Sequence, residues 1–132
     1  MFKFINSLRA SSSHMKAINH WARFNRSDAW GEISKAVYLE TNNKYLVKHL
    51  VFKGEIEYEI GKLKESKKSL NRAKELIDIE PKYWEKSSNK DILISLQEAI
   101  EKNEYQKDQG GFREHALFFE RPKKRLSSKP LS

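Results

Sequence analysis

The stretch KGEIEYEIGKLKESKKSLNRAKELIDIEP, from Lys53 to Pro81, decides the fold class of this chain. Its apolar residues follow steps of three and four on both sides of Gly61, which predicts two helices joined by a turn at that glycine. We expect the first helix over residues 44–60 and the second over residues 63–79. Pro81 stops the second helix. The stretch therefore predicts a helical hairpin.

A faint internal repeat with a period of 37 residues relates this hairpin to the segment before it. Small residues return as small, aromatic residues as aromatic, and aliphatic residues as aliphatic. The matched pairs are Ala17 with Gly54, Trp21 with Tyr58, Ala29 with Ser66, Ile33 with Leu70, and Ala36 with Ala73. A period of this length is typical of stacked helical hairpins, which usually bind partners rather than catalyse reactions.

Three further helices are expected, over residues 14–24, 28–41 and 89–107. Ser13 is placed to cap the first of them, and the asparagine pair after the second is a turn signal. The residues expected to face inward are Ala17, Ile18, Trp21 and Ala22 on the first, Trp30, Ile33, Ala36, Val37 and Leu39 on the second, and Ile92, Leu93, Leu96, Ala99 and Ile100 on the third.

The composition fits one all-α domain better than a turn-rich β fold. Of the 132 residues, 38% are hydrophobic and 33% charged, with five glycines, three prolines and no cysteine. The lack of cysteine excludes disulfides, thiolate metal sites and cysteine nucleophiles. We expect an all-α fold, a short stack of antiparallel helical hairpins with a capping helix and extended basic termini. Its parts are a basic arm over residues 1–13, a helical repeat domain over 14–107 and an aromatic-basic tail over 108–132.

The net charge of +8 is concentrated at the two ends of the chain. Residues 1–27 carry five bases and no acid, residues 28–107 carry 15 of each, and residues 108–132 carry six bases and three acids. Basic ends on an electrically mixed body indicate attachment to an acidic surface. The candidate contacts to phosphates or acidic side chains are Arg9, Arg121, Lys123, Lys124 and Arg125.

The first 13 residues, MFKFINSLRASSS, resemble a mitochondrial targeting segment. They contain lysine, arginine and several serines but no acid, and they lack the apolar core of a secretory signal. Phe2, Ile5 and Leu8 repeat at helical spacing, as expected for a short amphipathic helix. The alternative is an unstructured start whose composition is accidental.

The hairpin around Gly61 resembles a tetratricopeptide repeat, a family of helical hairpins whose first helices line a concave face. The matching residues are Gly54, Tyr58, Gly61, Ser66, Leu70, Ala73 and Pro81, and residues 15–41 give a weaker copy with Phe24 at the turn position. The resemblance implies a concave, partner-contacting face lined by Ile18, Trp21 and Ala22 on the first hairpin and by Lys48, Val51, Glu55, Tyr58 and Glu59 on the second. The favoured alternative for Trp21 and Tyr58 is that both pack in the core. The alternative to the two repeats together is an ordinary antiparallel helical bundle.

The segment FFERPKKR, from Phe118 to Arg125, resembles the end of the protein-twenty-one family of the ribosomal small subunit. Phe118 and Phe119 can anchor in a pocket, and the four bases that follow can neutralise phosphates or acidic side chains. A nuclear import signal and a solvated tail are the alternatives for the basic run.

Sequence motifs for catalysis are absent. His14, His20, His49 and His115 are far apart and show no paired spacing, and there is no glycine-rich phosphate loop or serine nucleophile motif. The glutamates around Tyr58, including Glu57, are expected on a solvated surface. We expect neither an enzyme nor a cofactor or metal site.

The leading hypothesis is a non-catalytic subunit of a large mitochondrial assembly, in the matrix or at the inner membrane. Its partners would be protein subunits, with ribosomal RNA or anionic lipid headgroups as further candidates and no small-molecule substrate. Basic ends with aromatic anchors favour the mitochondrial ribosome. The alternatives are an accessory subunit of a respiratory-chain or ATP synthase complex and a free adaptor that captures a peptide in its groove.

Overall fold

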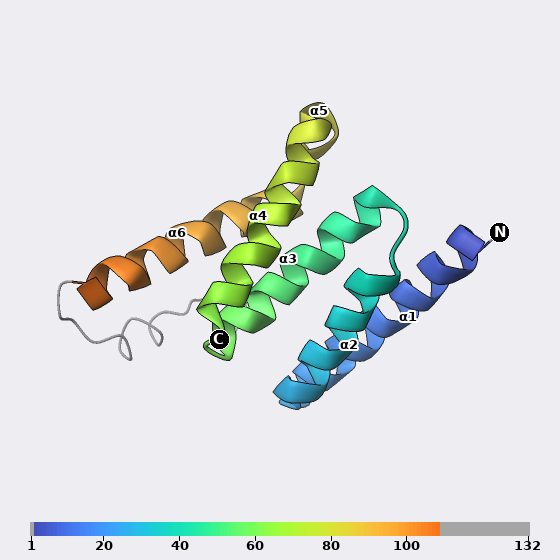
Figure 1. Cartoon of the computed structure of the whole chain (residues 1–132), viewed down its shortest axis with the longest axis horizontal. Helices are drawn as coiled ribbons and strands as arrows, with labels where there is room; N and C mark the ends of the chain where they lie inside the picture. The colour runs from blue at the N-terminus through green and yellow to red at the C-terminus, as the bar shows by residue number, and fades with distance from the viewer. Residues whose placement is uncertain (1, 109–132) are drawn as a thin grey trace. The chain divides into compact units, whose positions relative to one another are not determined.

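The computed structural model describes the backbone of residues 2–108 and the side chains of residues 3–102. This part of the chain is all-α, with six helices and no strand: α1 Phe2–Ala22, α2 Arg26–Leu39, α3 Asn43–Glu59, α4 Leu63–Ile79, α5 Pro81–Trp84 and α6 Ser88–Asp108. Two units divide the chain, residues 1–97 and 98–132, and of the second only the last turns of α6 are described. Within the first unit, α1 pairs with α2 and α3 pairs with α4 as antiparallel hairpins (Figure 1).

The two hairpins repeat each other with the period of 37 residues that the sequence predicts. α1 ends at Ala22 and α3 at Glu59, whereas α2 begins at Arg26 and α4 at Leu63, so each pair of boundaries differs by that period. The matched residues are also equivalent in burial. Those buried in both hairpins are Ala17 with Gly54, Ala29 with Ser66, Ile33 with Leu70, and Ala36 with Ala73, while Trp21 and Tyr58 are both half-buried.

The turns between the paired helices are equivalent as well. Phe24 has a φ of 64° and Gly61, 37 residues later, has a φ of 85°, so both turns use the left-handed region. In the first turn the Asn25 N–H donates to the His20 carbonyl at 2.8 Å, and in the second the Lys62 N–H donates to the Glu57 carbonyl at 2.7 Å. These bonds satisfy carbonyls at the helix ends. Phe24 therefore serves the role that glycine serves in the second hairpin.

The largest difference from the predicted elements lies at the N-terminus. The prediction of a separate basic arm over residues 1–13 is wrong for the described residues. In the structure α1 begins at Phe2 and continues without interruption past Ser13. Ser13 is buried within the helix and caps nothing, and Ala10 is fully buried. The small side chains on this face let α1 pack closely along its length, which extends the helix beyond the predicted start at residue 14.

The other boundaries are close to their predicted positions. α2 begins two residues early, after Asn25, whose side chain makes no capping bond. The predicted turn at Asn42 instead caps α3, since its Oδ1 accepts from the Lys44 and Tyr45 N–H groups at 2.9 and 3.4 Å. The linker expected before α6 contains the short helix α5.

A shared apolar core joins the first three helices. Its members are Ala10, Ala17, Ala29, Ile33, Ala36 and Ile56, with Trp21, Trp30, Leu39, Phe52 and Ile60 packed against them. Burying one large aliphatic side chain such as Ile33 or Ile56 stabilises the fold by about 1.5–3 kcal/mol. The prediction that Ile18 and Ala22 on α1 face inward is wrong, because both residues are exposed. On α6, Leu93 and Ile100 are buried as predicted, whereas Ile92 is exposed.

Candidate functional site

The residues predicted to line a concave face of the second hairpin lie on α3, and only some of them reach solvent. Lys48 and Glu59 are exposed, whereas Glu55 and Tyr58 are half-buried. Val51 is 2% exposed, so the prediction that it contacts a partner is wrong. The reason is geometric, since its side chain points into the packed interior rather than along the outer face of α3.

Trp21, the predicted contact on the first hairpin, packs against the shared core and is half-buried. The Arg26 guanidinium carbon lies 5.6 Å from the centre of the indole ring, within the range of a cation–π contact. The Trp21 ring therefore contacts other residues of this chain, as expected if it packs against the core.

The pKa of the Glu55 carboxyl lies above its ordinary value. Burial, and to a smaller extent the charge of Glu59, raises the pKa of this carboxyl to about 7. At neutral pH a substantial fraction of it is protonated and can donate a hydrogen bond.

A hydrogen-bonded chain links α1 to the α2–α3 turn and to α3. Ser7 Oγ donates to Glu40 Oε2 at 2.5 Å, and His49 Nε2 lies 2.7 Å from Glu40 Oε1. The Glu40 carboxylate also accepts from the next two backbone N–H groups at 3.1 and 3.0 Å. At the far end, His14 Nδ1 lies 2.6 Å from His49 Nδ1. We call these four residues the α1–α3 polar chain.

The contacts of the polar chain assign its protons. Because His49 Nε2 donates to a carboxylate, the neutral ring has a free lone pair on Nδ1, which accepts from His14 Nδ1–H. Burial lowers the pKa of His14 to about 4, aided by repulsion from His49 and Lys48. Burial also lowers the pKa of His49, although its hydrogen bond and attraction to Glu40 oppose this. Both rings are therefore neutral at physiological pH.

A second buried carboxylate joins α2, α3 and α4. The Glu57 side chain is fully buried and accepts from Trp30 Nε1 at 2.8 Å, Lys53 Nζ at 2.6 Å and Ser69 Oγ at 2.7 Å. The expectation that Glu57 is solvated is wrong, because three donors from three helices replace its water. Sequence spacing shows only the Lys53–Glu57 pair, four residues apart.

Neither set of contacts has the arrangement of a reaction centre. The Ser7 hydroxyl contacts a carboxylate and no imidazole, which is the base that serine nucleophiles use. Glu40, His49 and His14 follow one another in a line rather than surrounding a point. Among the described residues no group of three His, Cys, Asp or Glu could hold a metal ion. The arrangement connects helices.

The outer side of α1 carries an apolar stripe that the sequence predicted only in part, at Leu8, Ile18 and Ala22. Phe4, Leu8, Met15 and Ile18 are 68, 56, 58 and 41% exposed. The stripe follows alternating steps of four and three residues, and we call the full set the α1 seam: Phe4, Leu8, Ser11, Met15, Ile18 and Ala22. The signal was present in the spacing, but the longer start of the helix had to be known before the residues could be aligned.

A row of bases runs along another side of α1, about 100–140° around the helix from the centre of the α1 seam. Arg9, Lys16 and Arg23 are seven residues apart and exposed, so they lie along one edge of the helix. Among the described residues, no carboxylate lies within salt-bridge distance of these three bases. Of the predicted phosphate contacts, Arg9 thus belongs to a helix, on a different side from the apolar stripe.

The other predicted contacts lie outside the described residues. They are Phe118, Phe119, Arg121, Lys123, Lys124 and Arg125.

Comparison with protein-family models, with curated proteins and with solved structures finds no match to this chain. In the part of the chain that the structure describes, no helix is long and apolar enough to span a membrane.

Proposed function

We propose that the protein is a non-catalytic structural subunit of a large mitochondrial assembly, and that this assembly is the mitochondrial ribosome. The observation that carries the proposal is the repetition of one hairpin with a period of 37 residues in helix boundaries, turns and burial. Stacked hairpins present helix faces to neighbours. The order of small and aromatic residues in these hairpins supports their resemblance to tetratricopeptide repeats.

The proposed mitochondrial location is supported by the character of α1. Residues 1–27 contain five bases and no acid, and the helix has one exposed apolar side. Import receptors favour basic amphipathic helices of this kind. Because Ala10 and Ser13 are buried in the fold, we expect the imported chain to retain residues 1–13.

Import into isolated mitochondria tests the location. Lys3→Glu with Arg9→Glu should abolish import, and the matched variant Lys64→Glu with Lys68→Glu on α4 should not. All four side chains are exposed, so both variants should fold. Equal import of the two variants, or a uniformly cytosolic protein, would remove the mitochondrial part of the proposal.

Co-sedimentation with ribosomal particles tests the assembly. The tail bases are the proposed contacts to ribosomal RNA, so replacing Arg121, Lys123, Lys124 and Arg125 by alanine should weaken co-sedimentation and reduce its salt dependence. Recovery in a respiratory-chain or ATP synthase complex instead would favour an accessory subunit there. A monomer free of both complexes that loses peptide binding on Tyr58→Ala would favour the adaptor.

A further inference from the structure

Folding leaves the surface of the helical body more basic than its sequence suggests. Glu40 and Glu57 are buried together with their hydrogen-bond donors, whereas none of the lysines and arginines among residues 3–102 is buried. The equal numbers of acids and bases in residues 28–107 therefore do not balance on the outside, because these two carboxylates cannot pair with surface bases. A basic surface on a folded body is typical of nucleic-acid-binding proteins.

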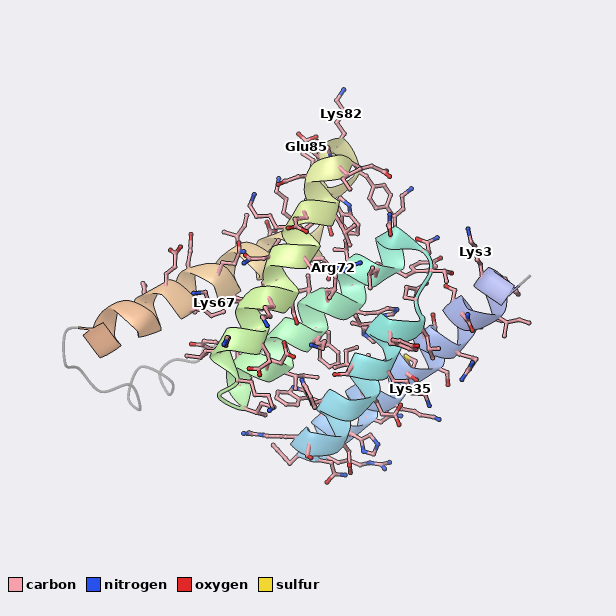
Figure 2. All side chains as sticks on the ribbon, viewed as in Figure 1. Lys3, Lys35, Lys67, Arg72, Lys82 and Glu85 are labelled. Carbon is pink, nitrogen blue, oxygen red and sulfur yellow. The ribbon has the colours of Figure 1, made fainter. Side chains whose placement is uncertain are left out.

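The first part of α4 carries a concentrated group of exposed bases. Residues 63–72 contain four of them and one exposed acid, Glu65; the bases are Lys64, Lys67, Lys68 and Arg72. Two of the four, Lys67 and Arg72, are labelled on α4 in Figure 2. Beyond Arg72 the balance reverses, because residues 73–80 contain one base and three acids. The basic surface is therefore confined to the first part of the helix.

Three of these bases form a single row, which we call the α4 basic row: Lys64, Lys68 and Arg72. They are four residues apart, so each lies about 6 Å further along the same side of the helix. Among the described residues, no carboxylate lies within salt-bridge distance of any of the three. The opposite side of α4 is buried against α3, so the row faces away from the packed interior.

The side chains around the α4 basic row favour a phosphate backbone over a protein or a lipid surface. The exposed residues of α4 from 64 to 75 are all charged except Asn71, and the first largely exposed apolar residue is Ile79. Protein interfaces use apolar or aromatic anchors, and a helix at a lipid surface needs an apolar face. Phosphate contacts need neither, because lysine and arginine neutralise the backbone and release its counterions.

We propose that the α4 basic row binds the phosphate backbone of RNA. Contacts of this kind position a protein on RNA without reading its sequence. The row thus adds a site on the folded body to the contacts proposed for the tail. The inference rests on the proposed function in one respect, because a ribosomal role is what places RNA rather than DNA beside the chain.

Binding of a fluorescein-labelled RNA hairpin to the full chain, measured by anisotropy over a range of salt concentrations, tests the inference. Replacing the three residues of the α4 basic row by alanine should weaken binding about tenfold or more at low salt. It should also reduce the slope of log affinity against log salt by roughly 2–3, since three phosphate contacts are lost.

The matched control variant replaces Lys35, Lys82 and Lys86 by alanine. It removes the same charge from exposed positions outside α4, so it should keep the salt slope of the parent chain. Circular dichroism should show the same helix content in both variants, because alanine favours helix at exposed positions. Equal losses of affinity in the two variants would overturn the proposal, since total charge and not the row would then govern binding.

The reactivity of lysine amines locates the contact independently of the variants. RNA should protect Lys64 and Lys68 from an acetylating reagent, while Lys35 and Lys82 react as they do in the free chain. If Lys64 and Lys68 react equally with and without RNA, the row is not the binding surface.

Two further probes address the other partners. Binding of polyglutamate as tight as that of RNA, and equally dependent on the α4 basic row, would replace RNA by an acidic protein. The same result with phosphatidylserine-containing vesicles would replace it by a membrane. A chain that binds RNA through the row but is not imported contradicts only the proposed function. A subunit recovered in mitochondrial ribosomes whose RNA binding is unchanged by the alanine variant of the row contradicts only this inference.

Discussion

Gly54 shows at the scale of one residue why the second hairpin closes as it does. A Cβ at this position would lie 2.7 Å from Leu70 Cδ2 and 2.8 Å from Leu70 Cγ. Close by, the Ser66 hydroxyl donates to the Gly54 carbonyl at 2.8 Å. α3 and α4 are therefore in contact through the glycine backbone, and any larger residue must push them apart or displace Leu70.

Gly54→Ala should destabilise the fold, in spite of the higher helix propensity of alanine. Overpacking costs about 1–3 kcal/mol, against a propensity gain of up to about 1 kcal/mol. The matched control is Gly31→Ala on α2, where an added Cβ meets no atom within 4 Å and only the gain remains. Urea unfolding should therefore show opposite signs for the two variants. Equal stabilisation by both would contradict the close contact.

His14 makes stability depend on pH. The unfolded ring takes up its proton near the ordinary histidine pKa of 6.5, whereas the folded ring has a pKa of about 4. Since the unfolded chain binds more protons between these values, stability falls as the pH decreases from 6.5 to 4, by at most about 3 kcal/mol. Glu55, whose pKa is raised to about 7, acts in the opposite sense, losing stability as the pH rises from 4.5 to 7.

His14→Gln isolates the histidine contribution. The glutamine amide can still donate to His49, but it does not titrate. We expect the variant to lose less stability than the parent chain between pH 6.5 and 4, as measured by urea unfolding at each pH. The control is His20→Gln on the same helix. If the two variants follow the same pH profile, His14 is not the group responsible.

At the scale of the elements, the two hairpin turns use the same backbone conformation with different residues. Phe24 and Gly61 both have positive φ, and no side-chain neighbour requires the glycine at residue 61. The Phe24 ring is 80% exposed, so it contributes little burial to offset the strain. In the first turn a residue other than glycine, Phe24, is therefore held in a strained backbone conformation.

Phe24→Gly should raise the free energy of unfolding by about 0.5–1 kcal/mol, because glycine adopts the left-handed region without strain. Gly61→Ala should lower it by about 1 kcal/mol for the same reason. Thermal unfolding followed by circular dichroism measures both. A loss of stability with Phe24→Gly would show that the exposed ring makes a contribution larger than the backbone strain.

At the scale of the molecule, residues 2–13 belong to the folded body rather than to an appendage. They contribute Ala10 to the shared core and Ser7 to the α1–α3 polar chain. Removing residues 1–13 should cost about 3 kcal/mol or more, because it uncovers α2 and leaves the Glu40 carboxylate short of a donor.

Hydrogen exchange measures that loss by element. In a chain lacking residues 1–13, the amides of α2 should exchange much faster than in the parent chain, and those of α4 should change less, because α4 packs chiefly on α3. Arg9→Glu, which changes an exposed residue of the same segment, is the control. Unchanged protection of α2 would mean that the segment is not part of the core.

The secondary structure could be read from the sequence because its signals are local. The steps of three and four, the proline after α4 and the repeat predicted five helices, four of them to within about two residues. The exception is α1. Its first half buries alanine and serine, which carry little apolar signal, so only the helices packed on it show that Ala10 faces inward.

The sequence by itself determined that this chain forms two similar helical hairpins and that its first 27 residues are basic, because spacing and charge are properties of neighbouring residues. Only the tertiary structure decided which polar groups are buried. The bonds of Glu57 reach across three helices, and His14 meets His49 from 35 residues away. It also decided that the α1 seam is exposed, because burial depends on which helix lies opposite, and no spacing within one helix specifies that.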